Sequence, residues 1–154
     1  MEKNRIIMMI ILGFMSIGTA GCGSADMSPR AIQPEVDTCE VCNMSIAHDE
    51  FAAQAVTEKG DHLMFDDIGC LVQYEGTKEI GAHYIKEHAT NEWIDADKAL
   101  YVYHKDFWTP MSYGVLAFTT REDAEAFIEQ EGKGELLKAG DLKEHEWGVH
   151  SHEE

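Results

Sequence analysis

The chain has 154 residues, and 29 acidic side chains against 12 basic ones give it a formal net charge of −17 at pH 7. A surface this acidic repels nucleic acid and anionic lipid, which excludes a nucleic-acid-binding function. The length suffices for one compact domain or two small halves. Beyond the N-terminal region, no apolar run is long enough to predict a membrane-spanning helix.

The N-terminus has the pattern of a bacterial secretion signal. Lys3 and Arg5 precede the apolar run 6–15, and Thr19-Ala20-Gly21-Cys22 resembles a lipobox. Such a short apolar run is typical of a signal peptide. We therefore predict a signal peptide over 1–21 and lipid attachment at Cys22, which places the protein on the cell membrane, facing the periplasm or the extracellular side. An ordinary cleaved signal is the alternative, because lipoboxes usually have an aliphatic residue in place of Thr19.

Residues 22–37 are mostly polar and small, include Pro29 and Pro34, and show no periodicity. This composition predicts a flexible tether behind the acylated cysteine. The segment from Gly23 to Thr38 extends over at most about 55 Å. We therefore expect the residues that follow the tether to stay near the membrane, within reach of a membrane-bound partner.

The first folded elements expected are two strands, 51–57 and 62–65, joined as a hairpin by a short turn at Gly60. Asp66 or Asp67 then caps a helix. The apolar face of this helix has the spacing i, i+3, i+4, and it consists of Ile68, Leu71 and Val72.

Further strands are predicted at 93–95, 99–104 and 115–118, where Tyr, Val and other strand-forming residues are frequent. The pattern Thr119-x-x-Glu122 is a capping box that begins a second helix, which ends near Gly132. The apolar face of the second helix consists of Ala124, Phe127 and Ile128.

The sequence of strand end, capped turn and amphipathic helix occurs twice, about 53 residues apart. This repeat predicts an α+β fold of two small ββαβ halves with antiparallel sheets, preceded by the flexible lipoprotein tether. We place the first half at 38–104 and the second at 105–139. An acidic, histidine-bearing and loose tail follows at 140–154.

Two thiols and a thioether lie within six residues, at Cys39, Cys42 and Met44. Soft sulfur ligands select Cu(I) over Mg²⁺, Ca²⁺ or Mn²⁺. Zinc accepts thiolates but does not use methionine. The motif therefore predicts a Cu(I) site in a protein held outside the cytoplasm.

Two alternatives stay open for the pair of Cys39 and Cys42. One is a zinc knuckle completed by Cys70 and a histidine. The other is a redox-active pair, which needs a thiolate stabilised by a helix N-terminus or a cation. Nearby carboxylates are expected to raise the thiol pKa values and to attract a bound cation, which disfavours the redox pair. These carboxylates are Asp37, Glu40 and Asp49.

Three residues outside the motif are further candidate ligands. Met111 lies in the loop 105–114, where Trp108 could shield a Cu(I) site from water, although methionine is more often core filler. Cys70 is either a third thiol facing the site or a small buried apolar residue. His48 lies four residues past Met44, and a solvated surface histidine is its competing interpretation.

Three motifs in this order resemble the NosL family of nitrous-oxide reductase accessory lipoproteins. They are Cys39-x-x-Cys42-Asn43-Met44, Phe65-Asp66-Asp67-Ile68-Gly69-Cys70 and Pro110-Met111-Ser112-Tyr113-Gly114. The resemblance covers nearly the whole mature chain up to about residue 132. It implies paired ββαβ halves and a Cu(I) chaperone without enzymatic activity.

The resemblance also implies partners and ligands. A membrane-bound copper transport and maturation complex is the expected partner, and nitrous oxide reductase is the expected copper enzyme client. The implied core ligands are Cys39 or Cys42 with Met44, and Met111 from the other half is a further one.

Asn43 stands where the family often has glycine, and both residue types tolerate left-handed backbone geometry. The rival function is a cell-envelope thiol–disulfide oxidoreductase using Cys39 and Cys42.

Overall fold

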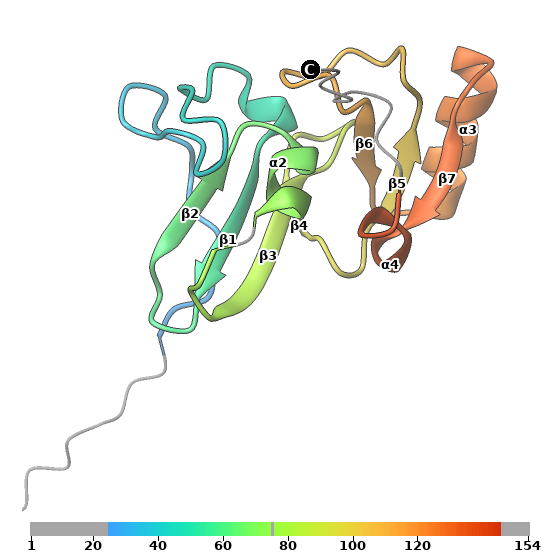
Figure 1. Ribbon diagram of the computed structural model, residues 1–154. Helices are drawn as coiled ribbons and strands as arrows, with labels where there is room; N and C mark the ends of the chain where they lie inside the picture. Colours follow the sequence, from blue (N-terminus) through green and yellow to red (C-terminus); the bar gives the residue numbers. More distant parts are fainter. Residues whose placement is uncertain (1–24, 75, 146–154) are drawn as a thin grey trace, which may run out of the picture.

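The computed structural model describes residues 25–74 and 76–145, and it forms an α+β fold with two antiparallel sheets lying side by side (Figure 1). The predicted signal peptide, Cys22 and the last part of the predicted tail lie outside the described residues. None of the helices in the described part is long and apolar enough to cross a membrane.

The first sheet has the strand order β2-β1-β3-β4. Its strands are β1 (Ala53–Thr57), β2 (His62–Phe65), β3 (Ile80–Lys86) and β4 (Trp93–Asp95), all paired antiparallel. A short 3-10 helix (Asp49–Phe51) precedes β1, and α2 (Ile68–Gln73) follows β2. Helix α2 lies on the side of the sheet that faces the second half (Figure 1).

The second sheet has the order β6-β5-β7, with α3 packed against all three strands. Its elements are β5 (Leu100–Tyr103), β6 (Val115–Phe118), α3 (Arg121–Glu131), β7 (Glu135–Lys138) and the short α4 (Ala139–Leu142). Gly132 ends α3 in the left-handed conformation, as its sequence position indicates.

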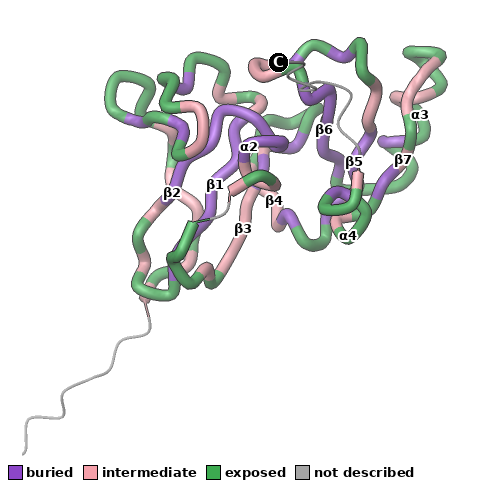
Figure 2. Tube along the Cα trace, in the orientation of Figure 1, coloured by how far each residue is buried: buried purple, intermediate pink, exposed green. Residues whose placement is uncertain are grey.

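One apolar cluster joins the two halves. It includes Phe65 and Ile85 from the first sheet and Tyr101 and Val115 from the second. A parallel bridge between Glu87 and Ala117 adds a backbone link between the sheets. In Figure 2 the buried segments accordingly run from β1 across α2 to β6 and β5. The two halves therefore share a core.

The predicted pair of ββαβ halves is confirmed, because β1-β2-α2-β3 is repeated as β5-β6-α3-β7. Two strands, β3 and β7, were not predicted. The predicted boundary after residue 104 is wrong, since β5 pairs with β6 and β7 and so belongs to the second half. The predicted cap at Thr119 is displaced by one residue, because the side chain of Thr120 accepts from the backbone N–H of Asp123.

The prediction of a flexible tether fails for residues 25–37, which lie against the first sheet and which we call the N-terminal strap. The side chain of Gln54 accepts from the backbone N–H of Arg30 at 3.2 Å and donates to its carbonyl at 3.0 Å. Tyr84 donates to the carbonyl of Met27. Arg30 also forms a bidentate ion pair with Asp37, at 2.6 and 2.8 Å.

The predicted loose tail over 140–154 is also incorrect at its start. Gly140 lies within α4, and Leu142 of the same helix is buried in the cluster that joins the halves. An apolar side chain in this position fixes the backbone around it, because leaving the core would expose it to water.

Candidate metal centre

The segment Thr38–Ser45 forms a tight loop at the end of β2. An antiparallel bridge joins Thr38 to Ser45, and the backbone N–H of Cys39 donates to the carbonyl of Met44 at 2.8 Å. Asn43 has φ +60°, so the left-handed geometry expected at this position is present. The loop is therefore closed by its own backbone.

The corner between β2 and α2 faces this loop. Glu40 donates its backbone N–H to the carbonyl of Met64 in β2, which fixes the loop beside the corner. Asp66 follows β2, and Asp67 caps α2 by accepting from the backbone N–H of Gly69 at 3.0 Å. Cys70 then lies within the first turn of α2. Two sequence-distant segments thus meet at one place.

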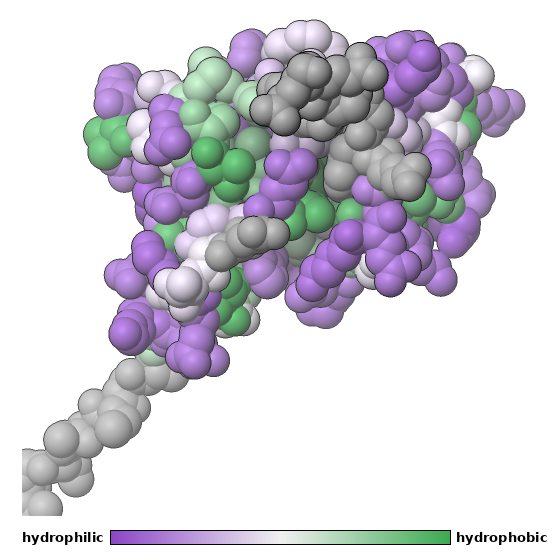
Figure 3. All heavy atoms as spheres, viewed as in Figure 1, coloured by the Kyte–Doolittle hydropathy of each residue, from purple (hydrophilic) through white to green (hydrophobic). Residues whose placement is uncertain are grey.

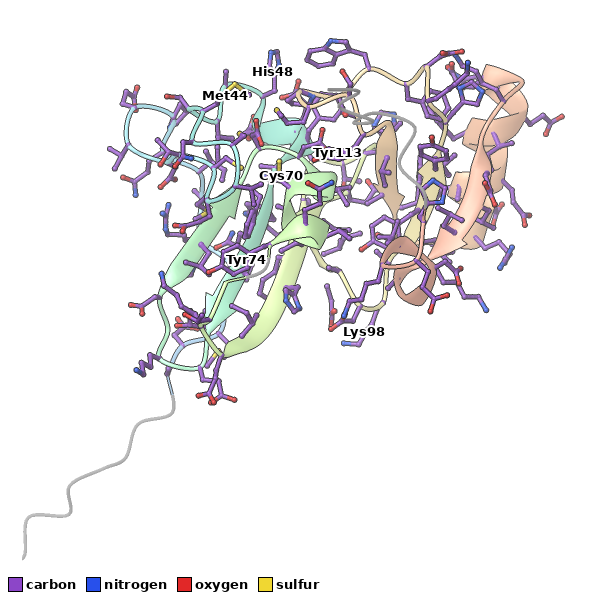
Figure 4. The ribbon with its side chains drawn as sticks, viewed as in Figure 1. Met44, His48, Cys70, Tyr74, Lys98 and Tyr113 are labelled. Carbon is purple, nitrogen blue, oxygen red and sulfur yellow. The ribbon has the colours of Figure 1, made fainter. Side chains whose placement is uncertain are left out.

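Gly69 allows α2 to approach the second half closely. A Cβ atom at this position would lie 2.0 Å from the ring of Tyr113, a distance that no real contact permits. The hydroxyl of Tyr113 donates to Gln73 further along the helix at 2.8 Å. Figure 4 shows Tyr113 beside Cys70. Helix α2, and with it Cys70, is held in place from the side of the second half.

Four side chains meet between the loop and the corner: Cys39, Cys42, Cys70 and Asp66. Their three sulfur atoms and one carboxylate oxygen all lie within 4.8 Å of one another. Cys39, Cys70 and Asp66 are buried, whereas Cys42 is partly accessible. The thiol of Cys42 donates to the carboxylate of Asp66, with 3.5 Å to each oxygen. This cluster has the size and the donor types of a metal site.

The three thiols have different pKa values. The Cys70 thiol donates to the sulfur of Cys39, and backbone N–H groups around that sulfur add to this effect, so that the pKa of Cys39 falls to about 6. Burial raises the pKa of Cys42 to about 12. Its hydrogen bond to Cys39 and its burial raise the pKa of Cys70 well above the usual range. At neutral pH the cluster therefore holds one thiolate and two thiols.

These pKa directions correct part of the expectation from sequence. Carboxylates were expected to raise the pKa of both motif thiols. The pKa of Cys39 falls instead, and the pKa of Cys42 rises mainly because the thiol is buried, with Asp66 as a smaller cause. Asp37 is paired with Arg30 within the strap. The carboxylate that contacts the cluster is Asp66.

Met44 and His48 line an open groove next to the cluster. The groove is bounded by Met44, Ser45, Ala47, His48, Asp66, Trp108 and Pro110. Met44 is 46% exposed and Trp108 is 60% exposed. The ring of Trp108 lies edge-on to His48, with 5.0 Å between centroids. Asp66 lines the groove and also contacts the Cys42 thiol, so the groove borders the cluster. Figure 4 shows Met44 and His48 at the same end of the molecule as Cys70.

Met111 reaches the same region from the second half. Its backbone N–H donates to Asp67 at 3.0 Å, and Thr109 donates to the same carboxylate oxygen at 2.6 Å. The Met111 side chain is partly buried against the apolar cluster that includes Cys39 and Cys70. Burial raises the pKa of Asp67, although these hydrogen bonds oppose the shift. Asp67 thus connects the Met111 loop to the metal-site corner.

Sequence reasoning identified most of the side chains that gather here. Cys39 and Cys42 lie together as the spacing predicts, and Cys70 faces them as a third thiol. Asp66 was treated only as a possible helix cap. Its signal in the sequence is the doubled acid before α2, since one carboxylate suffices for the cap. The described histidines contribute no donor to the cluster, so a knuckle completed by Cys70 and a histidine is not what the structure forms.

The fold and the site together define a class: an α+β protein of two ββαβ halves with a thiol-rich centre suited to a soft metal ion. The chain belongs to the NosL family, whose sequence model matches residues 29–147. Its fold is similar to that of a crystal structure described as the copper chaperone NosL from Shewanella denitrificans. That match has a TM-score of 0.60 and 22% identity, and it covers 73% of this chain and 93% of the other. No curated protein matches the sequence.

Proposed function

We propose that this protein is a Cu(I) chaperone that binds one copper ion at the cluster and passes it to a partner by ligand exchange. The observation that carries this proposal is the convergence of three cysteine sulfurs within 4.8 Å, beside an accessible methionine. Soft donors of this kind favour monovalent copper. Membership of the NosL family supports the same conclusion, as does the copper chaperone role ascribed to the protein of similar fold.

The chemistry of loading follows from the protonation of the thiols. Cys39 offers a thiolate at neutral pH, and it is the first sulfur able to bind the incoming ion. Thiols must lose their protons to ligate a metal, so recruiting Cys42 or Cys70 releases protons. The carboxylate of Asp66 accepts the hydrogen bond of the Cys42 thiol and is placed to take that proton.

Unloading needs an accessible route. Cys42 is partly exposed, and Met44 lies in the groove that leads to it. A thioether is a weaker ligand than a thiolate, so Met44 suits a transient contact during exchange. We assign Met111 a supporting position behind the site, and His48 a position at the rim of the groove. A partner thiol or thioether that enters this groove displaces the copper ligands one at a time.

The resemblance to accessory lipoproteins extends the proposal to the setting of the protein. We propose that Cys22 carries the lipid anchor, that a membrane-bound copper transport and maturation complex is the exchange partner, and that nitrous oxide reductase is the client. The net charge of −17 would attract a basic partner surface. Affinity for that partner should then fall as salt rises, and an unchanged affinity would refute the electrostatic part.

The test is an anaerobic titration of the reduced protein, residues 23–154, with Cu(I) in competition with a chromogenic chelator. We expect one-to-one binding that is strongly weakened by Cys39→Ser and by Cys70→Ser. Met44→Leu should slow transfer to a second chelator more than it lowers affinity. Met111→Leu is the matched thioether control. Absence of Cu(I) binding by the fully reduced protein would overturn the proposal.

One observation favours a second candidate, a thiol–disulfide oxidoreductase. The lowered pKa of Cys39 is a property that such enzymes need. However, Cys39 is only 1% exposed, and an attacking thiolate must reach its substrate. An insulin-reduction assay separates the two functions. Turnover that is abolished by Cys42→Ser would favour the oxidoreductase, whereas no turnover with intact copper binding would favour the chaperone.

A further inference from the structure

The N-terminal strap runs along the whole length of the first sheet. Its first described residue, Ala25, lies at the β1–β2 turn, where its Cβ is 3.3 Å from the position of a Cβ on Gly60. The strap then passes β3 and β1, held by Tyr84 and Gln54. It ends at Asp37, directly before Thr38, where the metal-site loop begins. The strap therefore connects two opposite ends of the molecule.

The two ends are well separated. Gly60 and Asp66 flank strand β2, and six residues of strand extend over about 20 Å. Figure 1 shows the described chain beginning at the β1–β2 turn, while the metal-site loop lies at the far end of the sheet. From Cys22 to Ala25 the chain spans at most about 11 Å. An anchor at Cys22 thus holds the turn end close to the membrane.

We infer that the anchored protein stands on its β1–β2 turn, with the metal centre on the side away from the membrane. This inference rests on the lipid anchor of the proposed function. It reverses the expectation that a flexible tether keeps the cysteines near the bilayer. The partner that exchanges copper here is then an extramembrane protein domain in the aqueous phase, and not a ligand within the bilayer.

The surfaces of the two ends agree with this orientation. In the part of the chain that the structure describes, the exposed large apolar side chains are Val36, Met44 and Trp108. All three lie in or next to the loops of the metal end, where a protein partner would bury them. The turn end is polar, and its concave surface is lined by Thr57, Glu58, Lys59, Asp61, Thr77, Lys78 and Glu79.

Figure 3 shows mostly hydrophilic side chains around the β1–β2 turn. Such a surface suits hydrated lipid headgroups. The strongly acidic body is repelled by anionic lipid, so a posture that touches the membrane only at one end has the lower electrostatic energy. The first argument favours the turn end as the end near the membrane, and the second favours contact at one end only.

Energy transfer to the membrane tests the orientation. The full chain, acylated in a bacterial host, is reconstituted in phosphatidylcholine–phosphatidylglycerol vesicles containing a headgroup-labelled acceptor lipid. A donor fluorophore is introduced through a noncanonical amino acid at Lys59, at the turn end, or at Glu50, next to the metal end. We expect clearly more efficient transfer from Lys59, given a height difference of about 20 Å. Equal efficiencies, or a higher one from Glu50, would overturn the inference.

Two variants show whether the anchor and the short link cause the orientation. A flexible Gly-Ser insertion between residues 24 and 25 leaves every described contact intact, and it should bring the two efficiencies together. A difference that survives the insertion would contradict the role of the short link. The Cys22→Ser variant, which has no lipid anchor, should not bind the vesicles. A wild-type chain that does not stay on the vesicles would also refute the inference.

The same samples separate this inference from the proposed function. Cu(I) binding is measured on the labelled, vesicle-bound proteins with the chelator assay. A preserved transfer difference without copper binding would refute the chaperone and leave the orientation standing. Copper binding with equal transfer efficiencies would refute the orientation and leave the chaperone standing.

Discussion

Cys39 shows how a neighbouring thiol and the backbone can set the charge of a metal site in an acidic protein. Its sulfur accepts hydrogen bonds from the Cys70 thiol and from backbone N–H groups, including those of Cys42 and Asp66. These donors stabilise a thiolate although the protein as a whole is strongly negative. Because the local donors lie in contact with the sulfur and most carboxylates do not, the local effect decides the pKa.

Replacing Cys70 tests this account of the thiolate. In Cys70→Ala the principal donor to Cys39 is lost, so the pKa of Cys39 should rise from about 6 toward its ordinary value of 9.0. Thiolate absorbance in the ultraviolet, followed through a pH titration of the reduced, metal-free protein, measures the change. Cys39→Ser should abolish the transition near pH 6. An unaltered titration in Cys70→Ala would show that the backbone donors alone suffice.

The same shift predicts a pH dependence of stability. The folded state releases the Cys39 proton near pH 6, whereas the unfolded chain keeps it until about pH 9. The unfolded state binds more protons in this interval, so the free energy of unfolding of the metal-free protein should rise from pH 6 to 9. Urea denaturation across this range measures the slope, which Cys39→Ser should reduce.

For single residues, the sequence predicts contacts between near neighbours in the chain. It misses contacts that depend on the register between distant segments. Cys39 and Cys42 are three residues apart, so any tight loop brings their sulfurs together. Asp66 is 24 residues from Cys42 in the chain. Only the register between the loop and β2 directs Asp66 rather than Asp67 to the thiols, and two adjacent identical residues give no local sign of this difference.

Among the elements, α2 depends on close packing against the second half. In Gly69→Ala the new methyl group would lie 2.0 Å from the ring of Tyr113, so the ring or the helix must shift. We expect the free energy of unfolding to fall by about 1–3 kcal/mol, as for overpacked cores. Urea denaturation measures the loss.

Gly140→Ala is the matched control for that substitution. Gly140 also lies in a helix, but a Cβ there has no neighbour within 4 Å. The control should be neutral or stabilise the protein by up to about 1 kcal/mol. A similar loss of stability in both variants would show that contact with Tyr113 is not the cause.

The N-terminus of α3 offers a second test of element structure. Thr120→Ala removes the side chain that accepts from the backbone of Asp123, and it should cost about 0.5–2 kcal/mol. Thr119→Ala leaves this cap in place and should change stability by less. Thermal or urea unfolding of the two variants distinguishes them. If Thr119→Ala lost more stability than Thr120→Ala, the helix cap would be Thr119, as the sequence pattern indicates.

The elements predicted correctly carry their own pattern, and the missed ones depend on partners. Strand β3 contains Gly81 and His83, which weaken its apolar alternation. It forms because β1 pairs with it along its length. The strap then covers its outer face, where a Cβ on Gly81 would lie 2.9 Å from the sulfur of Met27. Strand β7 is short and likewise exists through its pairing with β5.

For the whole molecule, the strap changes how the first sheet is stabilised. Every residue of β1 is buried, because α2 and the second half cover one face and the strap covers the other. Ile32 of the strap packs against a separate apolar cluster that contains Ile46 and Met64. A composition of small and polar residues does not reveal this role, since the sheet supplies most of the contacts.

Replacing the strap therefore tests the architecture as a whole. Exchanging residues 25–37 for a Gly-Ser segment of equal length removes two kinds of contact. These are the packing of Ile32 against its apolar cluster and the hydrogen bonds between the Arg30 backbone and the Gln54 side chain. We expect the free energy of unfolding to fall by about 2–4 kcal/mol, because the partly buried side chains of Ile32 and Met27 lose their contacts together with the polar ones.

Copper binding provides the second measurement on these chains. The metal-site loop is closed by its own bridge between Thr38 and Ser45 and by the link from Glu40 to Met64. The replacement leaves both in place, so Cu(I) affinity should change far less than stability does. Unchanged stability would mean that the contacts of the strap with the sheet do not contribute to the free energy of unfolding. A loss of copper affinity in a folded replacement variant would mean that the strap also shapes the metal site. The lipid anchor would then be coupled to the metal through the same segment that sets the orientation of the protein.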